Sequence, residues 1–175
     1  MKSKHPASIL HAILVAIAAF AAVSCSTTRR IPDDDILYTG LKGVSYEAPD
    51  SVRLPSAMKT SITNSVNVRP NNSVSILGYV WRYPFPLGLW VYNNWPNPEK
   101  GFRHWLYEKL AAEPVLLSDV RPEVRTHMIE QILDNNGFFR GTATYELIQG
   151  RNKKKAKVKY TVTPGPGFPV DTVEL

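Results

Sequence analysis

The stretch from Ile132 to Leu147, "ILDNNGFFRGTATYEL", changes its hydrophobic period at Gly137. Before Gly137 the apolar residues recur at helical spacing, and after it they alternate as in a β-strand. Glycine just beyond a helix adopts a left-handed conformation at little cost. The stretch therefore predicts a helix that ends at Gly137, with Phe138 and Phe139 entering the edge of the core before a strand begins.

The residues on either side extend this pattern into a helix and a hairpin. Pro122 is placed for a first helical turn. The apolar stripe of this helix comprises Val124, Met128, Ile129, Ile132 and Leu133. Residues 142–148 and 155–163 alternate, and a turn at 149–152 joins them into an antiparallel hairpin with one solvated face. The buried face is expected to carry Ala143, Tyr145 and Leu147, followed by Ala156, Val158, Tyr160 and Val162.

Two further elements are predicted upstream. Residues 36–47 are rich in β-formers and read as a strand interrupted by Gly40 and Gly43. The next segment is a helix whose stripe comprises Leu54, Met58, Ile62 and Val66. The order strand, helix, helix, strand, strand predicts an α+β fold with helices on one face of a small mixed sheet.

An aromatic and proline-rich segment, residues 67–113, interrupts this order. Its aromatic cluster comprises Trp81, Tyr83, Trp90, Tyr92 and Trp95. Three interpretations stay open: the rings pack over a thin core, lie at a membrane interface, or stack on sugars or peptides. Residues 99–111 predict a short helix. Its buried side is expected to carry Phe102, Trp105, Leu106 and Leu110.

The amino-terminal residues have the pattern of a targeting segment. Lys2 and Lys4 precede an apolar run at 9–23, which predicts a signal peptide over residues 1–24. Cys25 is the single cysteine, and "AVSC" resembles a bacterial lipoprotein cleavage box. That resemblance implies acylation of Cys25, and several acyl chains on one residue give stable membrane anchoring. Residues 25–35 are polar and charged, so a flexible lipidated tether is expected there.

Composition gives no support for nucleic-acid binding or catalysis. The net charge of +6 is a weak basic bias. His104 and His127 have no evident nucleophile or carboxylate partner in the sequence, and we expect no cofactor and no metal site. Asp33, Asp34 and Asp35 have no spaced second cluster, which favours a solvated linker over a metal site. The sequence therefore predicts a non-enzymatic protein.

The element order resembles that of a polypeptide-transport-associated (POTRA) domain of the outer-membrane assembly superfamily that includes BamA and TamA. The motif L-x-x-x-G-F-F, realised from Leu133 to Phe139, carries this resemblance. The segments "CSTTRRIPDDDILYTG", "RPNNSVSILG", "LWVYN" and "EPVL" follow the order seen in the TamL-like lipoproteins of Bacteroidetes. The resemblance implies a POTRA-like domain over 36–164, and residues 165–175 are expected to begin a further module.

The resemblance also implies a location and a way of binding. It places the protein on the outer membrane through its lipid anchor, with the domain in the periplasm. The strand around 142–148 is implied to be an edge, where Thr142, Thr144, Tyr145 and Glu146 would bind unfolded outer-membrane proteins or an assembly-complex subunit by β-augmentation. The lysine run 153–159 is either a solvated strand face or a contact for acidic headgroups. The alternative function is a carbohydrate- or peptide-binding envelope lipoprotein that uses the aromatic cluster.

Overall fold

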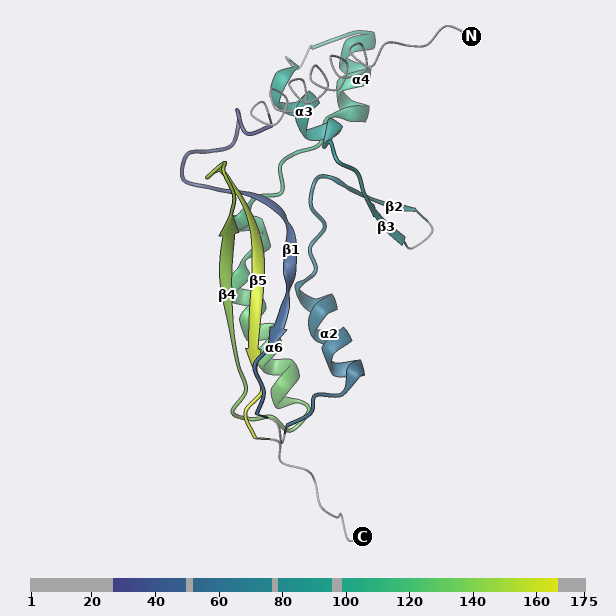
Figure 1. The fold of residues 1–175 in the computed structure, drawn as a ribbon. Coiled ribbons are helices and arrows are strands. Elements are labelled where there is room, and N and C mark those ends of the chain that lie inside the picture. Colours follow the sequence, from purple (N-terminus) through teal and green to yellow (C-terminus); the bar gives the residue numbers. More distant parts are fainter. Residues whose placement is uncertain (1–26, 50–51, 77–78, 96–98, 167–175) are drawn as a thin grey trace, which may run out of the picture. The chain divides into compact units, whose positions relative to one another are not determined.

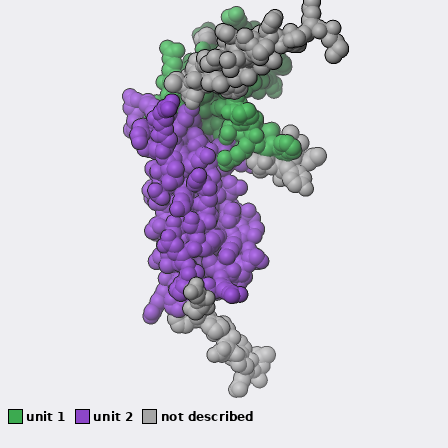
Figure 2. Space-filling view, viewed as in Figure 1, with its two compact units in different colours: residues 1–32, 71–114 green, residues 33–70, 115–175 purple. Residues whose placement is uncertain are grey.

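The computed structural model describes residues 27–49, 52–76, 79–95 and 99–166, and the protein has an α+β fold. The chain divides into two compact units (Figure 2). We call residues 33–70 and 115–175 the sheet unit, and residues 1–32 and 71–114 the aromatic unit. The expected signal peptide, Cys25 and nearly all of the expected module at 165–175 lie outside the described residues.

The sheet unit is built on a three-stranded mixed sheet (Figure 1). Its strands are β1 (Leu37–Tyr46), β4 (Thr142–Gln149) and β5 (Lys155–Thr163), in the order β1-β5-β4. β5 runs parallel to β1 and antiparallel to β4. The β1–β5 register shifts on either side of Leu41, next to Gly40 and Gly43, which both have positive φ. The predicted strand with two glycine interruptions and the predicted hairpin are both confirmed.

The helices of the sheet unit supply the other half of its core. They are α2 (Ser56–Val66), the short α5 (Leu117–Val120) and α6 (Pro122–Asp134). The core cluster contains Leu54 just before α2, three residues of α2 and two of α6, namely Met58, Ile62, Val66, Ile129 and Leu133. Ala156, Val158, Tyr160 and Val162 of β5 are all buried as predicted. On β4 the predicted face is only partly buried, because Ala143 is buried, Leu147 is half-buried and Tyr145 is exposed. Val124 and Met128 are exposed, so the inward stripe of α6 is narrower than predicted, and the buried Thr126 belongs to it.

The end of α6 has the hydrogen-bond pattern of a Schellman motif. The N–H of Phe138 bonds the carbonyl of Leu133 at 3.0 Å, and the N–H of Gly137 bonds that of Asp134 at 3.0 Å. Gly137 has φ of 84°, in the left-handed region. The predicted helix stop is confirmed. Phe138 packs against the core, but Phe139 is exposed, so only one of the two phenylalanines enters the core edge.

The aromatic unit contains two short strands and two helices. β2 (Ser73–Ile76) pairs antiparallel with β3 (Tyr79–Arg82), followed by α3 (Leu87–Asn94) and α4 (Phe102–Leu110). Gly88 lets the end of α4 approach α3, because a Cβ at Gly88 would lie 2.8 Å from the Cβ of Ala112. The N–H of Ala112 bonds the carbonyl of Gly88 at 3.0 Å across this contact.

Residues 27–32 are part of the aromatic unit, and this differs from the expected flexible tether. Thr27, Thr28 and Ile31 are buried. The buried amide of Asn93 accepts a hydrogen bond from the N–H of Arg30 at 2.8 Å and donates one to the carbonyl of Thr27 at 3.2 Å. The segment is held because its main-chain groups are satisfied by a helix side chain, which its polar composition does not reveal.

The acidic residues after this segment are bonded within the sheet unit. The carboxylate of Asp35 accepts hydrogen bonds from the Ser118 hydroxyl at 2.5 Å and the Ile36 N–H at 2.7 Å. Partial burial raises the pKa of Asp35, but these hydrogen bonds outweigh it and leave the pKa below its ordinary value. Asp33 pairs with the ammonium of Lys154 at 2.6 Å. Asp35 thus anchors the start of β1, whereas Asp33 and Asp34 are exposed, as predicted for a solvated linker.

Candidate partner-binding edge

β4 forms one edge of the three-stranded sheet. Within the described part of the chain, β5 is the only strand that pairs with it. An edge strand leaves every second residue with its N–H and C=O directed away from the sheet. The main-chain groups of β4 that are directed away from β5 are therefore the candidate partner-binding site.

A hydrogen bond at the start of β4 shows which of its residues direct their main-chain groups away from β5. The N–H of Ala143 donates to Oε1 of Glu130 on α6 at 3.2 Å, so Ala143 is directed away from β5. Alternation then directs Tyr145 and Leu147 outward as well. Thr142, Thr144 and Glu146 instead direct their main-chain groups toward β5, opposite Thr163, Thr161 and Lys159.

The predicted edge residues therefore divide into two sets. Tyr145 presents its main chain at the edge, whereas Thr142, Thr144 and Glu146 contribute exposed side chains on the solvated face of the sheet. Leu147 belongs to the outward set and was not predicted. Period-two alternation in a sequence separates two faces, but it does not say which residues bond the neighbouring strand. The direction of each main chain follows here from the Ala143–Glu130 hydrogen bond and from the register with β5.

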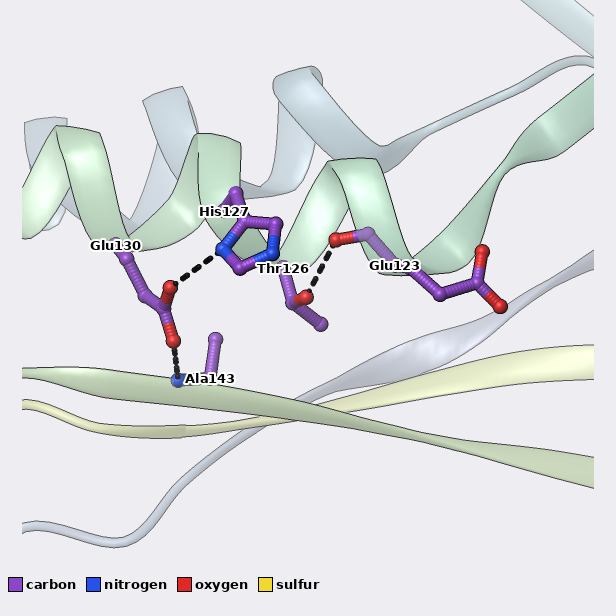
Figure 3. A network of polar contacts seen from close by, with 5 residues as sticks. All are labelled: Glu123, Thr126, His127, Glu130 and Ala143. Atoms are coloured by element: carbon purple, nitrogen blue, oxygen red, sulfur yellow. Dashed lines mark hydrogen bonds and ion pairs between the residues drawn. The ribbon is translucent and has the colours of Figure 1, made fainter.

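Helix α6 places two carboxylates along this edge (Figure 3). Glu130 uses Oε1 for the Ala143 N–H and Oε2 for Nδ1 of His127, at 3.0 Å. The buried Thr126 donates its hydroxyl to the carbonyl of Glu123 at 2.6 Å within the same helix. Glu130 already accepts the hydrogen bond from the first outward N–H of β4, that of Ala143, and so takes the place of the acceptor that a neighbouring strand would supply.

The second carboxylate, Glu123, contacts a side chain of β4. Oε1 of Glu123 accepts a hydrogen bond from the Tyr145 hydroxyl at 2.5 Å. This bond lowers the pKa of Glu123 and raises the pKa of Tyr145. It fixes the Tyr145 ring toward α6 and leaves the main chain of Tyr145 directed outward.

The predicted aromatic cluster does not form a single exposed patch. Trp81 is 65% exposed on β3. Tyr83, Trp90, Tyr92 and Trp95 are half-buried. The hydroxyl of Tyr83 donates to the carbonyl of Asn71 at 2.9 Å, and the ring of Trp90 lies 6.4 Å from that of Phe85. The contacts of these four residues favour the packing interpretation for them.

Arg30 contacts Tyr92 and Trp95, the last two residues of the predicted aromatic cluster. Its guanidinium lies 5.8 Å from the centre of the Tyr92 ring. It also donates to the carbonyls of Tyr92 at 2.6 Å and Trp95 at 3.2 Å. Tyr92 and Trp95 are thus involved in holding residues 27–32, which is a structural role.

The exposed rings are instead on α4. Phe102 is 72% exposed and Trp105 is 51% exposed, and Leu110 is exposed as well. The structure therefore contradicts the prediction that these three residues form the buried side of this helix. Sequence periodicity identified the apolar face correctly, but it cannot say whether that face has a neighbour.

The lysine run divides between two roles. Lys154 pairs with Asp33, and this contact lowers the pKa of that carboxyl through the hydrogen bond and through the charge of the ammonium. Lys157 on β5 is exposed, and Lys159 lies opposite Glu146 of β4. The outward face of β5 is thus a partly solvated, basic strand face.

The two helical histidines have carboxylate neighbours on their own helices, so the prediction that they lack a carboxylate partner is wrong. His104 lies 3.3 Å from Glu108, and His127 lies 3.0 Å from Glu130. Across residues 27–49, 52–76, 79–95 and 99–166, no group of three or more His, Cys, Asp or Glu side chains is placed to hold a metal ion. In the same residues no helix is long and apolar enough to cross a membrane. The predicted non-enzymatic role stays a prediction.

Comparisons with known proteins found no relative. The chain matches no protein-family model, no curated protein and no solved structure.

Proposed function

We propose that this protein is a lipid-anchored periplasmic module of an outer-membrane protein assembly factor, and that it binds client or partner chains by β-augmentation at β4. The observation that carries the proposal is the outward main chain of Tyr145 and Leu147 on an edge that β5 alone pairs within the described residues. A strand added there gains main-chain hydrogen bonds that do not depend on its sequence. Such binding suits a module that handles many different unfolded β-strands.

The carboxylates beside the edge set the direction in which a client strand would extend. Among the described residues, no side chain bonds the outward main chain between Tyr145 and Gln149, so a strand can pair there without displacing one. Toward Ala143 it must replace Glu130 as the acceptor of the N–H. We therefore expect pairing to begin at Tyr145 and Leu147 and to reach Ala143 only when Glu130 moves aside.

Crosslinking tests the location of the client. A photoreactive side chain at Thr144 lies on the solvated face of β4, and one at Lys42 lies on β1, the opposite edge strand. With an unfolded outer-membrane β-barrel protein as the probe, we expect crosslinks from position 144 and few from position 42. Equal yields from both positions, or none from position 144, would contradict binding at β4.

The anchor is the second part of the proposal. Cys25 and the residues before it support acylation by their resemblance to a lipoprotein cleavage box. Mass spectrometry of the mature chain should show acyl chains on Cys25 and none in a Cys25→Ser variant. An unmodified thiol at Cys25 would remove the anchor and leave the strand-binding proposal to stand on β4 alone.

A second candidate function is binding of carbohydrate through exposed rings. The observation that favours it is the 65% exposure of Trp81, since an exposed indole can stack on a sugar. Titration of soluble glycans against tryptophan fluorescence distinguishes the two candidates. Saturable quenching that a Trp81→Ala variant loses would favour carbohydrate binding, whereas no quenching favours the strand-binding module.

A further inference from the structure

Helix α4 presents a stacked aromatic pair to solvent. The rings of Phe102 and Trp105 lie 5.6 Å apart with an interplanar angle of 25°. They are 72% and 51% exposed, and no residue of α4 is buried. Large rings are normally removed from water. Two exposed rings that contact each other, together with the exposed Leu110 at the end of the same helix, therefore indicate a surface that binds a partner.

The residues of α4 divide into an apolar face and a polar face. Residues three and four apart lie on the same side of a helix, so Phe102, Trp105 and Leu106 share one face. Lys109 follows Trp105 by four residues and lies beside them, where its long stem can extend past an apolar layer to a polar one. The opposite side carries His104, whose Nδ1 is buried within the unit. Aromatic rings combined with a lysine on one face are typical of helices that lie in a membrane interface.

The start of the chain connects the aromatic unit, to which α4 belongs, to the proposed lipid anchor. Thr27 is 1% exposed, and its carbonyl is held by Asn93 of α3 at 3.2 Å. Cys25 precedes Thr27 by two residues. Two residues span at most about 7 Å of extended chain. A lipid on Cys25 would therefore hold the aromatic unit itself at the bilayer surface, because the tether is packed into that unit.

We infer that α4 lies in the outer-membrane interface beside the anchor, with the rings of Phe102 and Trp105 inserted among the lipid headgroups. The inference rests on the proposed acylation of Cys25. A lipid surface is the partner of these rings because the anchor brings lipid to this unit. In addition, Lys109 adds a positive charge beside the rings, and Lys100 and Arg103 lie next to Phe102 in the sequence. Tryptophan is favoured at the level of the headgroups, where its ring is partly apolar and its N–H can reach water.

Tryptophan quenching by lipid tests this placement. The acylated full-length chain is inserted in vesicles of phosphatidylethanolamine and phosphatidylglycerol whose acyl chains carry bromine near the headgroups, which quenches tryptophans in contact with lipid. We expect strong quenching for the unaltered chain and for Trp90→Phe, a half-buried ring of the same unit. Trp105→Phe should lose at least half of the quenched emission. Quenching that is the same with and without Trp105 would overturn the inference, as would protection of Trp105 by a protein partner in place of lipid.

A parallel measurement separates this inference from the proposed anchor. Flotation of the vesicles reports membrane attachment, and mass spectrometry reports acylation of Cys25. A Phe102→Ser, Trp105→Ser double variant should still float, because its acyl chains remain. Its quenching should fall by at least half. If the unaltered chain is acylated and floats but Trp105 is not quenched, the inference is wrong and the anchor stands. If Cys25 is unmodified and the chain does not float, both fall.

Discussion

The carboxylate of Glu130 accepts a hydrogen bond from the main-chain N–H of Ala143 at 3.2 Å, so a helix side chain occupies the first outward amide of the edge strand β4. The same carboxylate bonds His127 through its other oxygen (Figure 3). Natural proteins protect edge strands with charged side chains because open edges pair with other chains. Glu130 gives such protection to Ala143 and leaves Tyr145 and Leu147 available.

Removing this side chain should lengthen the open edge. In a Glu130→Ala variant the Ala143 N–H becomes available to a client strand, and a typical hydrogen bond contributes about 0.5–1.5 kcal/mol. We expect a roughly two- to tenfold tighter binding of a fluorescent strand peptide, measured by anisotropy. Gln131→Ala, an exposed change on the same helix, serves as the control and should leave affinity unaltered. Unchanged or weaker binding by Glu130→Ala would show that Glu130 does not compete with the client.

The Tyr145–Glu123 contact gives a prediction about pH. The Tyr145 hydroxyl lowers the pKa of Glu123 in the folded protein. The contact therefore stabilises the fold at pH values above the ordinary glutamate pKa of about 4.3, and this stabilisation is lost as the pH falls through the lowered folded value. In Tyr145→Phe the Glu123 pKa should rise toward its ordinary value, which NMR titration of the side-chain carboxyl can follow. A Glu123 titration identical in both proteins would mean that the hydrogen bond is absent in solution.

The left-handed Gly137 is predicted to be the most sensitive residue of the α6 terminus. Its φ of 84° disfavours any residue with a Cβ. We expect Gly137→Ala to lower the free energy of unfolding by about 1–2 kcal/mol, measured by urea denaturation. Gly150 lies in the hairpin turn, where an added Cβ would meet no atom within 4 Å. Gly150→Ala should change the free energy of unfolding by less than about 0.5 kcal/mol, and equal effects at both glycines would contradict this account.

The attachment of residues 27–32 depends on the buried Asn93. Its amide bonds the carbonyl of Thr27 and the N–H of Arg30, so Asn93→Ala leaves both without this partner. We expect trypsin to cleave after Arg29 and Arg30 at least fivefold faster in the variant, since a lost buried hydrogen bond costs about 1–3 kcal/mol. The same change at Asn136, in the sheet unit, is the control and should not alter this cleavage. Cleavage at the original rate in Asn93→Ala would indicate that other contacts hold the segment.

Much of the sheet unit could be predicted from sequence because its signals are local. The apolar stripe from Leu54 to Val66 and the alternation in β5 can each be recognised within a short segment. Gly137 indicates the end of a helix because glycine favours the left-handed conformation found there. The packing of neighbouring elements favours the same structure that these local preferences favour, so the local prediction holds in the fold.

The candidate site was predicted less well because its properties depend on distant neighbours. The main chain of Tyr145 is directed away from β5 and that of Thr144 toward it, and both directions follow from the Ala143–Glu130 hydrogen bond together with the pairing with β5. The exposure of Phe102 and Trp105 depends on the absence of a covering element in the described chain, which periodicity does not encode. Helix α3 lies within the proline-rich segment 67–113, where the only helix predicted was the one at 99–111.

Proline and alanine at residue 145 test the central claim most directly. Both changes remove the Tyr145 side chain, but only proline also removes its outward N–H, and proline is tolerated on an edge strand where the N–H faces away from the sheet. The probe is a peptide of about ten residues with the alternating pattern of a transmembrane β-strand. Circular dichroism first confirms that both variants are folded. We predict that Tyr145→Ala retains binding and that Tyr145→Pro binds about tenfold more weakly or not at all. Equal affinity of the two folded variants would contradict pairing at the edge of β4.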